Sequence, residues 1–252
     1  ITAHAENSFI YLSDNRKILS DTIDVQYYNN IITAQLKHKK ALAGFRLEEN
    51  KFHLYGKDFN DNFISKLFYL SKFKGGSLDF SASGNIDEYQ GTMYLKDTVI
   101  IDYKILNNIL AFINTVPSLI TFSLPGYSTN GLYTDTAYLR FNTKNNLIHL
   151  SDIYLDSKEI DIVGKGIINI EKETLDVDLN LQTDLGSKLS QVPVVGYIIF
   201  DEKSISTTLN IDGSLSNPSV KSLIAKEIIV APINIIKRTL LLPYKIFQDL
   251  KR

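Results

Sequence analysis

Most of the chain alternates between apolar and polar residues with a period of two, the pattern of β-strands that bury one face. The alternation is clearest in residues 174–183 and 204–213. Mostly aspartate, asparagine, serine and threonine stand between the apolar positions, and these side chains suit a solvated opposite face. The apolar residues that we expect to share one face are Leu175, Val177, Leu179, Leu181, Ile205, Leu209 and Ile211.

The same pattern continues through most of the sequence and is interrupted by turn signals. From Leu132 to Leu181 it predicts four strands, with turns at residues 142–146, 156–159 and 171–174. Turns spaced ten to fifteen residues apart are typical of an antiparallel meander. Further strands are predicted near residues 8–13, 22–28, 31–37, 41–47, 50–56, 76–83, 89–95 and 97–103.

Two short helices are predicted between the sets of strands. The first lies near residues 59–70, where Asn60 or Asp61 can serve as the N-cap and Phe59 and Phe63 begin an apolar stripe. The second lies near residues 105–116. Because each falls between sets of strands, we expect both helices to cover a long sheet.

Residues 105–134 contain no charged residue and must therefore be tested against a membrane-spanning helix. Such a helix takes about 20 mostly apolar residues. Polar residues and prolines interrupt every window of that length, namely Asn107, Asn108, Asn114, Pro117, Ser118, Ser123 and Pro125. The sequence therefore favours a buried helix followed by a strand.

The end of the chain changes to a helical pattern. Asn217 followed by Pro218 is typical of a helix N-cap and first helical position. We therefore predict a β-domain over residues 1–216 and a basic amphipathic helical tail over residues 217–252. From Ser219 to Arg252 there are seven Lys or Arg and two Asp or Glu, a balance of +5, against −6 for the remainder.

The tail has two possible roles. An apolar stripe flanked by basic residues is typical of helices that lie on anionic membranes, and it also suits docking on a protein partner. The alternative is an ordinary amphipathic helix packed on the sheet. The residues predicted to contact a membrane or partner are Ile233, Ile236, Lys237, Arg238, Leu240, Tyr244 and Phe247.

The sequence shows no pattern of catalytic residues. There is no cysteine, and the four histidines lack ligand spacing, so neither a thiolate site nor another metal site is predicted. No phosphate-binding loop, dinucleotide fingerprint or nucleophile elbow is present. The net charge of −1 and the absence of interleaved basic and aromatic residues argue against nucleic-acid binding. We therefore expect a non-enzyme without cofactors.

Residues 192–220 and 231–247 resemble the C-terminal region of the AsmA-like family of bacterial envelope proteins. They are most similar to its YhdP branch, which is related to TamB and to the bridge-like lipid transfer proteins. The similarity rests on an apolar turn, an alternating strand, a Gly-x-Leu-x-x-Pro step and the basic tail. The turn residues that carry it are Pro193, Gly196, Gly213 and Pro218. Residues 75–100 and 131–179 are similar to the strand ladder of the same family.

The resemblance implies a mainly β fold, in which a long, strongly curved antiparallel sheet forms an open apolar groove. The seven apolar residues of residues 174–183 and 204–213 would line it. Phospholipid acyl chains would slide along this groove between the inner and outer membranes of a Gram-negative cell. The chain would then be the C-terminal segment of a periplasmic, inner-membrane-anchored protein, and the Pro193–Gly196 turn would redirect it toward the tail.

Two other functions remain open at the level of sequence. The first is an envelope assembly protein, whose sheet would bind extended protein segments by strand addition. A closed β-sandwich would instead pack its apolar faces on each other and bind nothing.

Overall fold

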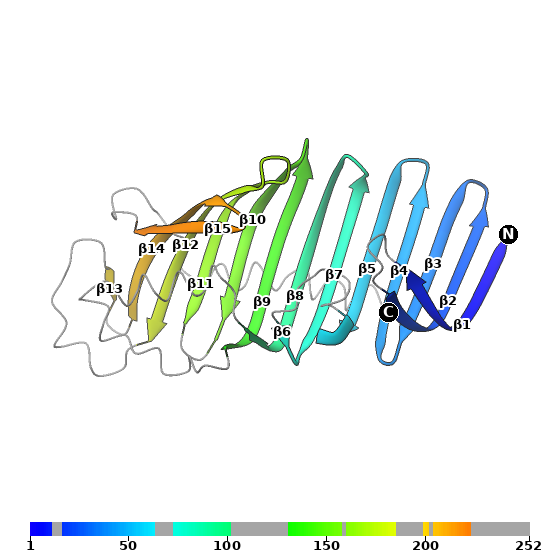
Figure 1. Cartoon of the computed structure of the whole chain (residues 1–252), viewed down its shortest axis with the longest axis horizontal. Coiled ribbons are helices and arrows are strands. Elements are labelled where there is room, and N and C mark those ends of the chain that lie inside the picture. The colour runs from blue at the N-terminus through cyan, green and yellow to red at the C-terminus, as the bar shows by residue number, and fades with distance from the viewer. Residues whose placement is uncertain are drawn as a thin grey trace.

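The computed structural model describes residues 1–11, 17–63, 73–101, 131–157, 160–184, 199–201 and 204–222. In these residues fifteen strands form a single sheet (Figure 1). The strands are β1 (Thr2–Tyr11), β2 (Lys17–Tyr28), β3 (Ile31–His38), β4 (Ala41–Glu48), β5 (Lys51–Phe59), β6 (Phe73–Lys74), β7 (Ser77–Asn85), β8 (Glu88–Ile100), β9 (Leu132–Lys144), β10 (Leu147–Asp156), β11 (Asp161–Asn169), β12 (Thr174–Asp184), β13 (Ile199–Asp201), β14 (Ser204–Ser214) and β15 (Asn217–Ser222).

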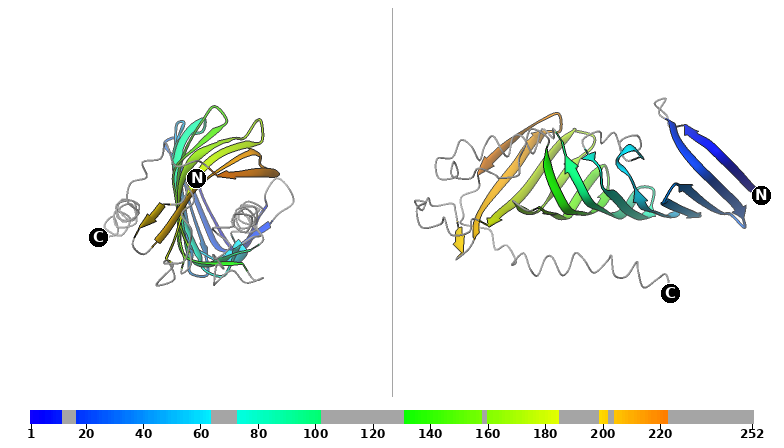
Figure 2. Two further views of the ribbon diagram at one scale, coloured as in Figure 1. Left: turned by 90° about the vertical axis from the view of Figure 1, so that its left-hand side faces the viewer. Right: turned by 90° about the horizontal axis from the view of Figure 1, so that it is seen from below.

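The sheet is an antiparallel meander in which neighbouring strands are almost always consecutive in the sequence. The main path contains thirteen strands, namely β1 to β12 without β6, followed by β14 and β13. The short strand β6 pairs with β8, and β15 pairs with β14. Figure 2 shows that the sheet is long and strongly curved. The predicted mainly β fold with a long curved antiparallel sheet is confirmed.

Several hairpins have two-residue turns that fit their sequences. Asn29 and Asn30 connect β2 to β3 with φ angles of 48° and 60°, and Asn145 and Asn146 connect β9 to β10 with 51° and 61°. A tight hairpin turn with positive φ at both central residues matches the right-handed twist of the strands, and asparagine tolerates this conformation well. These turns therefore fix the pairing of their hairpins.

The first predicted helix is shorter at its start than the sequence suggested. Phe59 is the last residue of β5, and residues 61–63 are helical. Asn60 is the N-cap, because its Oδ1 accepts a hydrogen bond from the Phe63 amide at 3.1 Å. Phe59 pairs with Leu78 of β7, and this strand pairing keeps it in the sheet. Residues 64–72 and the second predicted helix, near 105–116, lie outside the described residues.

The predicted helix start at Asn217 and Pro218 is wrong. Residues Asn217–Ser222 form β15, which makes a hairpin with β14 through Leu215 and Ser216. Proline is tolerated here because β15 is an edge strand and does not need every amide for the ladder. Pro218 and Val220 also alternate on the same face as Leu209 and Ile211, so period two prevails over the helix signal. The β-sheet therefore extends past residue 216 to Ser222, and residues 223–252 lie outside the described range.

Candidate functional site: the apolar face of the sheet

One face of the sheet carries an apolar row that runs across consecutive strands. In the strand register, each residue of this row stands opposite the next, and every one is aliphatic, aromatic, methionine or glycine. We call it the central row. From β1 to β14 it consists of Ala5, Ile23, Leu36, Ala43, Gly56, Phe80, Met93, Leu139, Ile153, Gly164, Leu179 and Leu209.

A second row lies two residues along each strand, or three in β10, and is also free of polar residues; we call it the parallel row. It consists of Ala3, Val25, Ala34, Phe45, Leu54, Ala82, Gly91, Phe141, Leu150, Gly166, Val177, Ile211 and Val220. With neighbouring strands about 4.8 Å apart, both rows extend for about 50 Å along the molecule. The two rows together form a continuous apolar face.

The bulge in β10 keeps this face apolar. The register shifts between Leu150 and Asp152, so one extra residue stands opposite β9. In a regular strand without a bulge, Leu150 and Ile153 would point to opposite faces, because their spacing of three is odd. The shift lets both join the apolar face, opposite Gly166 and Gly164 of β11.

Glycines in the two rows are covered by large side chains of neighbouring strands. A Cβ on Gly56 would lie 2.2 Å from the ring of Phe80, and one on Gly91 would lie 2.5 Å from the ring of Phe141. The rings therefore pack directly on the backbone of the next strand. Glycine positions of this kind let a sheet curve, and Figure 2 shows strong curvature.

Burial of the apolar face differs between its two halves. Leu179, Leu209 and Ile211 are 7%, 0% and 1% exposed and belong to a large buried cluster. Leu36, Phe45 and Met93 are only partly buried. Within the two rows, residues over β3 to β8 are therefore more accessible than those over β12 to β14, although Phe59 and Leu78 on the same face are 1% and 0% exposed and belong to a second buried cluster.

The structure brings together the residues that the sequence placed on one face. Leu175, Val177, Leu179, Leu181, Leu209 and Ile211 are all buried in one hydrophobic cluster. Ile205 lies in β14 opposite Thr183, and its side chain is outside the described set. This juxtaposition supports the predicted surface; its lipid-lining role stays a prediction.

The four predicted turn residues have different outcomes. Gly213 lies in β14 with a φ of 104°, a conformation that favours glycine, and it pairs with Pro218. The Gly-x-Leu-x-x-Pro step is therefore a tight β-hairpin. Pro193 and Gly196 lie outside the described residues. So do the tail residues predicted to contact a membrane or partner, Ile233, Ile236, Lys237, Arg238, Leu240, Tyr244 and Phe247.

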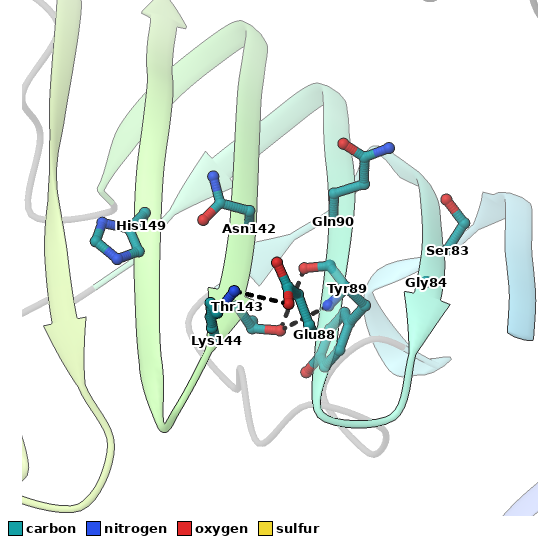
Figure 3. Close-up of a pocket in the computed structure, with 9 residues that line it drawn as sticks. All are labelled: Ser83, Gly84, Glu88, Tyr89, Gln90, Asn142, Thr143, Lys144 and His149. Atoms are coloured by element: carbon teal, nitrogen blue, oxygen red, sulfur yellow. Dashed lines mark hydrogen bonds and ion pairs between the residues drawn. The ribbon is translucent and has the colours of Figure 1, made fainter. Parts of the chain in front are cut away.

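A shallow polar depression of about 340 Å³ lies on strands β7 to β10 (Figure 3). The Lys144 ammonium and the Glu88 carboxylate form an ion pair at 2.9 Å, with both side chains more than half exposed. The Thr143 hydroxyl donates to the Tyr89 carbonyl oxygen at 3.2 Å. These groups partner one another and present no nucleophile activated by a base. The depression therefore does not compete with the apolar face as a candidate site.

Sequence reasoning missed a buried aromatic cluster on the opposite, polar face. Tyr94, Tyr138, Tyr154 and Val163 stand opposite one another on β8 to β11, and we call them the tyrosine row. Burial raises the pKa of the Tyr138 phenol, and a hydrogen bond at 3.2 Å from Arg140 Nε opposes this effect. The sequence feature that could have revealed this cluster is the Tyr-Leu pair that recurs at 94–95, 138–139 and 154–155. In each pair the leucine faces the apolar side and the tyrosine faces the polar side.

The described residues offer no arrangement for metal binding. Among them, no group of three or more acidic or histidine side chains is close enough to hold an ion. No helix within the described ranges has the length and apolar character needed to cross a membrane.

Together, the single curved sheet and its uninterrupted apolar rows define, in the described residues, an elongated β-protein whose distinguishing surface is apolar. Residues 2–220 match the family described as YhdP protein. The chain therefore belongs to the YhdP family, a family of bacterial envelope proteins that is not a family of enzymes. No curated protein and no solved structure matches the chain.

Proposed function

We propose that the apolar face carries phospholipid acyl chains and that the chain is part of a lipid transport bridge of the bacterial envelope. The observation that carries this proposal is the continuity of the two rows, which cross the sheet from β1 to β14 without a polar residue. Contiguous apolar surface of this extent is rarely left exposed to water and marks a binding surface.

The dimensions suit acyl chains. The hydrocarbon core of a bilayer is about 30 Å thick, so a chain in one leaflet spans about 15 Å. Rows of about 50 Å are long enough for about three such chains placed end to end. An acyl chain has no polar groups along its length, so it needs no site-specific partners. Protein segments would instead leave backbone amides and carbonyls unpaired against this face.

The proposal is tested by lipid mass spectrometry of the protein purified from bacterial envelopes in mild detergent. We expect phospholipid in near-stoichiometric or greater amount, and a loss of most of it in Leu179→Asp, because a carboxylate interrupts the central row. Asn180→Asp is the matched control, since it places the same group on the polar face one residue away. If Leu179→Asp does not fold, Leu139→Gln tests a partly buried position of the same row.

A folded wild-type protein without phospholipid would contradict the proposal. Equal lipid in Leu179→Asp and Asn180→Asp would contradict it as well. Either result would favour the assembly protein, in which extended segments add to an edge of the sheet through backbone hydrogen bonds. Binding of extended peptides would then be the next measurement.

A further inference from the structure

A row of uncharged polar residues crosses five neighbouring strands on the polar face of the sheet. It consists of His53, Ser83, Gln90, Asn142 and His149, which stand opposite one another on β5, β7, β8, β9 and β10. We call it the polar row. Its last four residues line the depression of about 340 Å³, and Figure 3 shows them side by side on their strands.

The side chains of the polar row have unused hydrogen-bonding groups. Within the described residues none of the five makes a hydrogen bond or ion pair through its side chain, and all are at least partly exposed. Elsewhere on the same face, comparable groups are paired: the hydroxyls of Ser81 and Thr92 lie 2.9 Å apart, and the Asn180 amide donates to the Thr208 hydroxyl at 3.2 Å. The polar row is therefore available to a ligand that supplies both donors and acceptors.

An aromatic ring flanks one end of the polar row. The ring of Tyr55 lies 6.1 Å from that of His53, measured between centroids, and both residues belong to β5. The Tyr55 ring packs on the backbone of β4, because a Cβ on Gly44 would lie 2.3 Å from it. Tyr55 is only partly buried, so this end of the row combines an accessible aromatic ring with hydrogen-bonding groups.

These groups fit a carbohydrate better than an ionic ligand. The residues that line the depression include one cation, Lys144, and one anion, Glu88, which pair with each other at 2.9 Å. The depression therefore has no net charge that would attract an ion. Sugar hydroxyl and acetamido groups both donate and accept hydrogen bonds, as the amides and the hydroxyl of the polar row do. The apolar C–H face of a sugar ring packs on an aromatic ring such as that of Tyr55.

We propose that the polar row binds a glycan strand of peptidoglycan, the polysaccharide layer of the bacterial envelope. Its β-1,4-linked sugars carry the hydroxyl and acetamido groups that the row can pair. Neighbouring strands lie about 4.8 Å apart, so the row extends for about 19 Å. The rings of an extended β-1,4 glycan repeat at a comparable spacing, so successive sugars meet successive strands. The glycan and the acyl chains occupy opposite faces of the sheet, and neither proposal depends on the other.

Co-sedimentation of the full chain with purified peptidoglycan sacculi tests the proposal. We expect the wild type to bind and a soluble, uncharged N-acetylglucosamine oligosaccharide to compete with the sacculi. Asn142→Asp is expected to weaken binding about tenfold, because a carboxylate cannot donate the hydrogen bonds that the amide donates. Asn180→Asp is the matched control, since it makes the same change on the same face outside the polar row, and it keeps wild-type binding.

Three outcomes would overturn the proposal. One is a wild-type chain that does not sediment with the sacculi. Another is equal binding by Asn142→Asp and Asn180→Asp. The third is binding that salt abolishes and the oligosaccharide does not reduce, which would indicate attraction between charges. If Asn142→Asp does not fold, Gln90→Val removes the amide of an exposed residue of the row and should cause a similar loss. None of these results bears on lipid in the apolar face, which the Leu179 variant tests separately.

Discussion

At the scale of single residues, two positions show how neighbouring groups shift the pKa of a side chain and limit the size of a residue. The His4 imidazole on β1 contacts the Asp24 carboxylate of β2 at 2.6 Å and Glu6 at 3.3 Å. The hydrogen bond with Asp24, followed by that with Glu6, raises the pKa of His4 above its usual 6.5. At position 91, by contrast, steric contact limits the size of the residue, because a Cβ there would overlap the Phe141 ring and the Ser81 carbonyl oxygen.

The His4 pKa predicts a pH-dependent link between β1 and β2. Because the pKa is raised in the folded state, the stabilisation is complete below about pH 6.5 and is lost as the pH rises through the folded value. Asp24→Asn is expected to lower the His4 pKa, and Glu6→Gln to lower it less. An NMR titration of the imidazole measures both shifts. A larger effect of Glu6→Gln would contradict this assignment.

Gly91→Val is expected to destabilise the protein by about 1–3 kcal/mol, because the new side chain overlaps a ring and a backbone oxygen that cannot both move. Gln90→Val is the control on the exposed face of the same strand, and it should change stability by less than about 0.5 kcal/mol. Urea unfolding followed by circular dichroism gives both values. Equal stability of the two variants would show that Phe141 does not pack on Gly91.

At the scale of elements, the β14–β15 hairpin closes the described end of the sheet. Asp212 of β14 accepts a hydrogen bond from Lys221 Nζ at 2.5 Å. It also accepts one from the Ser219 hydroxyl. These two contacts, with Lys221 first, lower the pKa of Asp212 below its usual 3.8. The contacts of Asp212 with Lys221 and Ser219 thus stabilise the polar face of the hairpin, and Val220 belongs to the parallel row on its apolar face.

Lys221→Met is therefore expected to raise the Asp212 pKa toward its usual value. Since the carboxylate is the favoured form in the hairpin, its stabilisation is present above about pH 3.8 and is lost as the pH falls through the folded value. Carboxyl NMR titration measures the shift. Lys144→Met, on the distant β9, serves as the control and should leave Asp212 unchanged. An unchanged Asp212 in Lys221→Met would show that the pair does not persist in solution.

At the scale of the whole molecule, the apolar face is continuous, but its accessibility is uneven. Most residues of the two rows are partly buried over β3 to β8 and nearly fully buried over β12 to β14. If acyl chains occupy this face, they should contact the accessible half most readily. A photoreactive phenylalanine analogue at Phe45 is expected to cross-link phospholipid in envelopes, whereas the same analogue at Arg46, on the polar face, is not. Equal cross-linking at both positions would contradict an acyl-chain surface.

The sequence by itself determined most of the strands and their two faces, although the strands predicted near residues 89–95 and 97–103 are the single strand β8. Period-two alternation is a local property that burial of one face imposes, so the four strands between Leu132 and Leu181 and the apolar set from Leu175 to Ile211 followed from it. Their role in lipid binding was predicted too and needs the experiments above, and the tail contacts stay a prediction. The tail beyond Ser222 and the turn at Pro193 lie outside the described residues.

Only the tertiary structure decided how the strands align. The continuity of the two rows depends on register, which arises from pairing between distant residues, and on the bulge that lets Leu150 and Ile153 share a face. The Asn217–Pro218 signal is local and fits a helix start as well as an edge strand; pairing with β14 selected the strand. Likewise, the three Tyr-Leu pairs indicate a cluster only when the pairing of β8 to β11 places their tyrosines and Val163 in one row. Local pattern fixes the face of residues in regular strands, whereas long-range pairing fixes the bulge in β10 and the neighbours of each residue on its face.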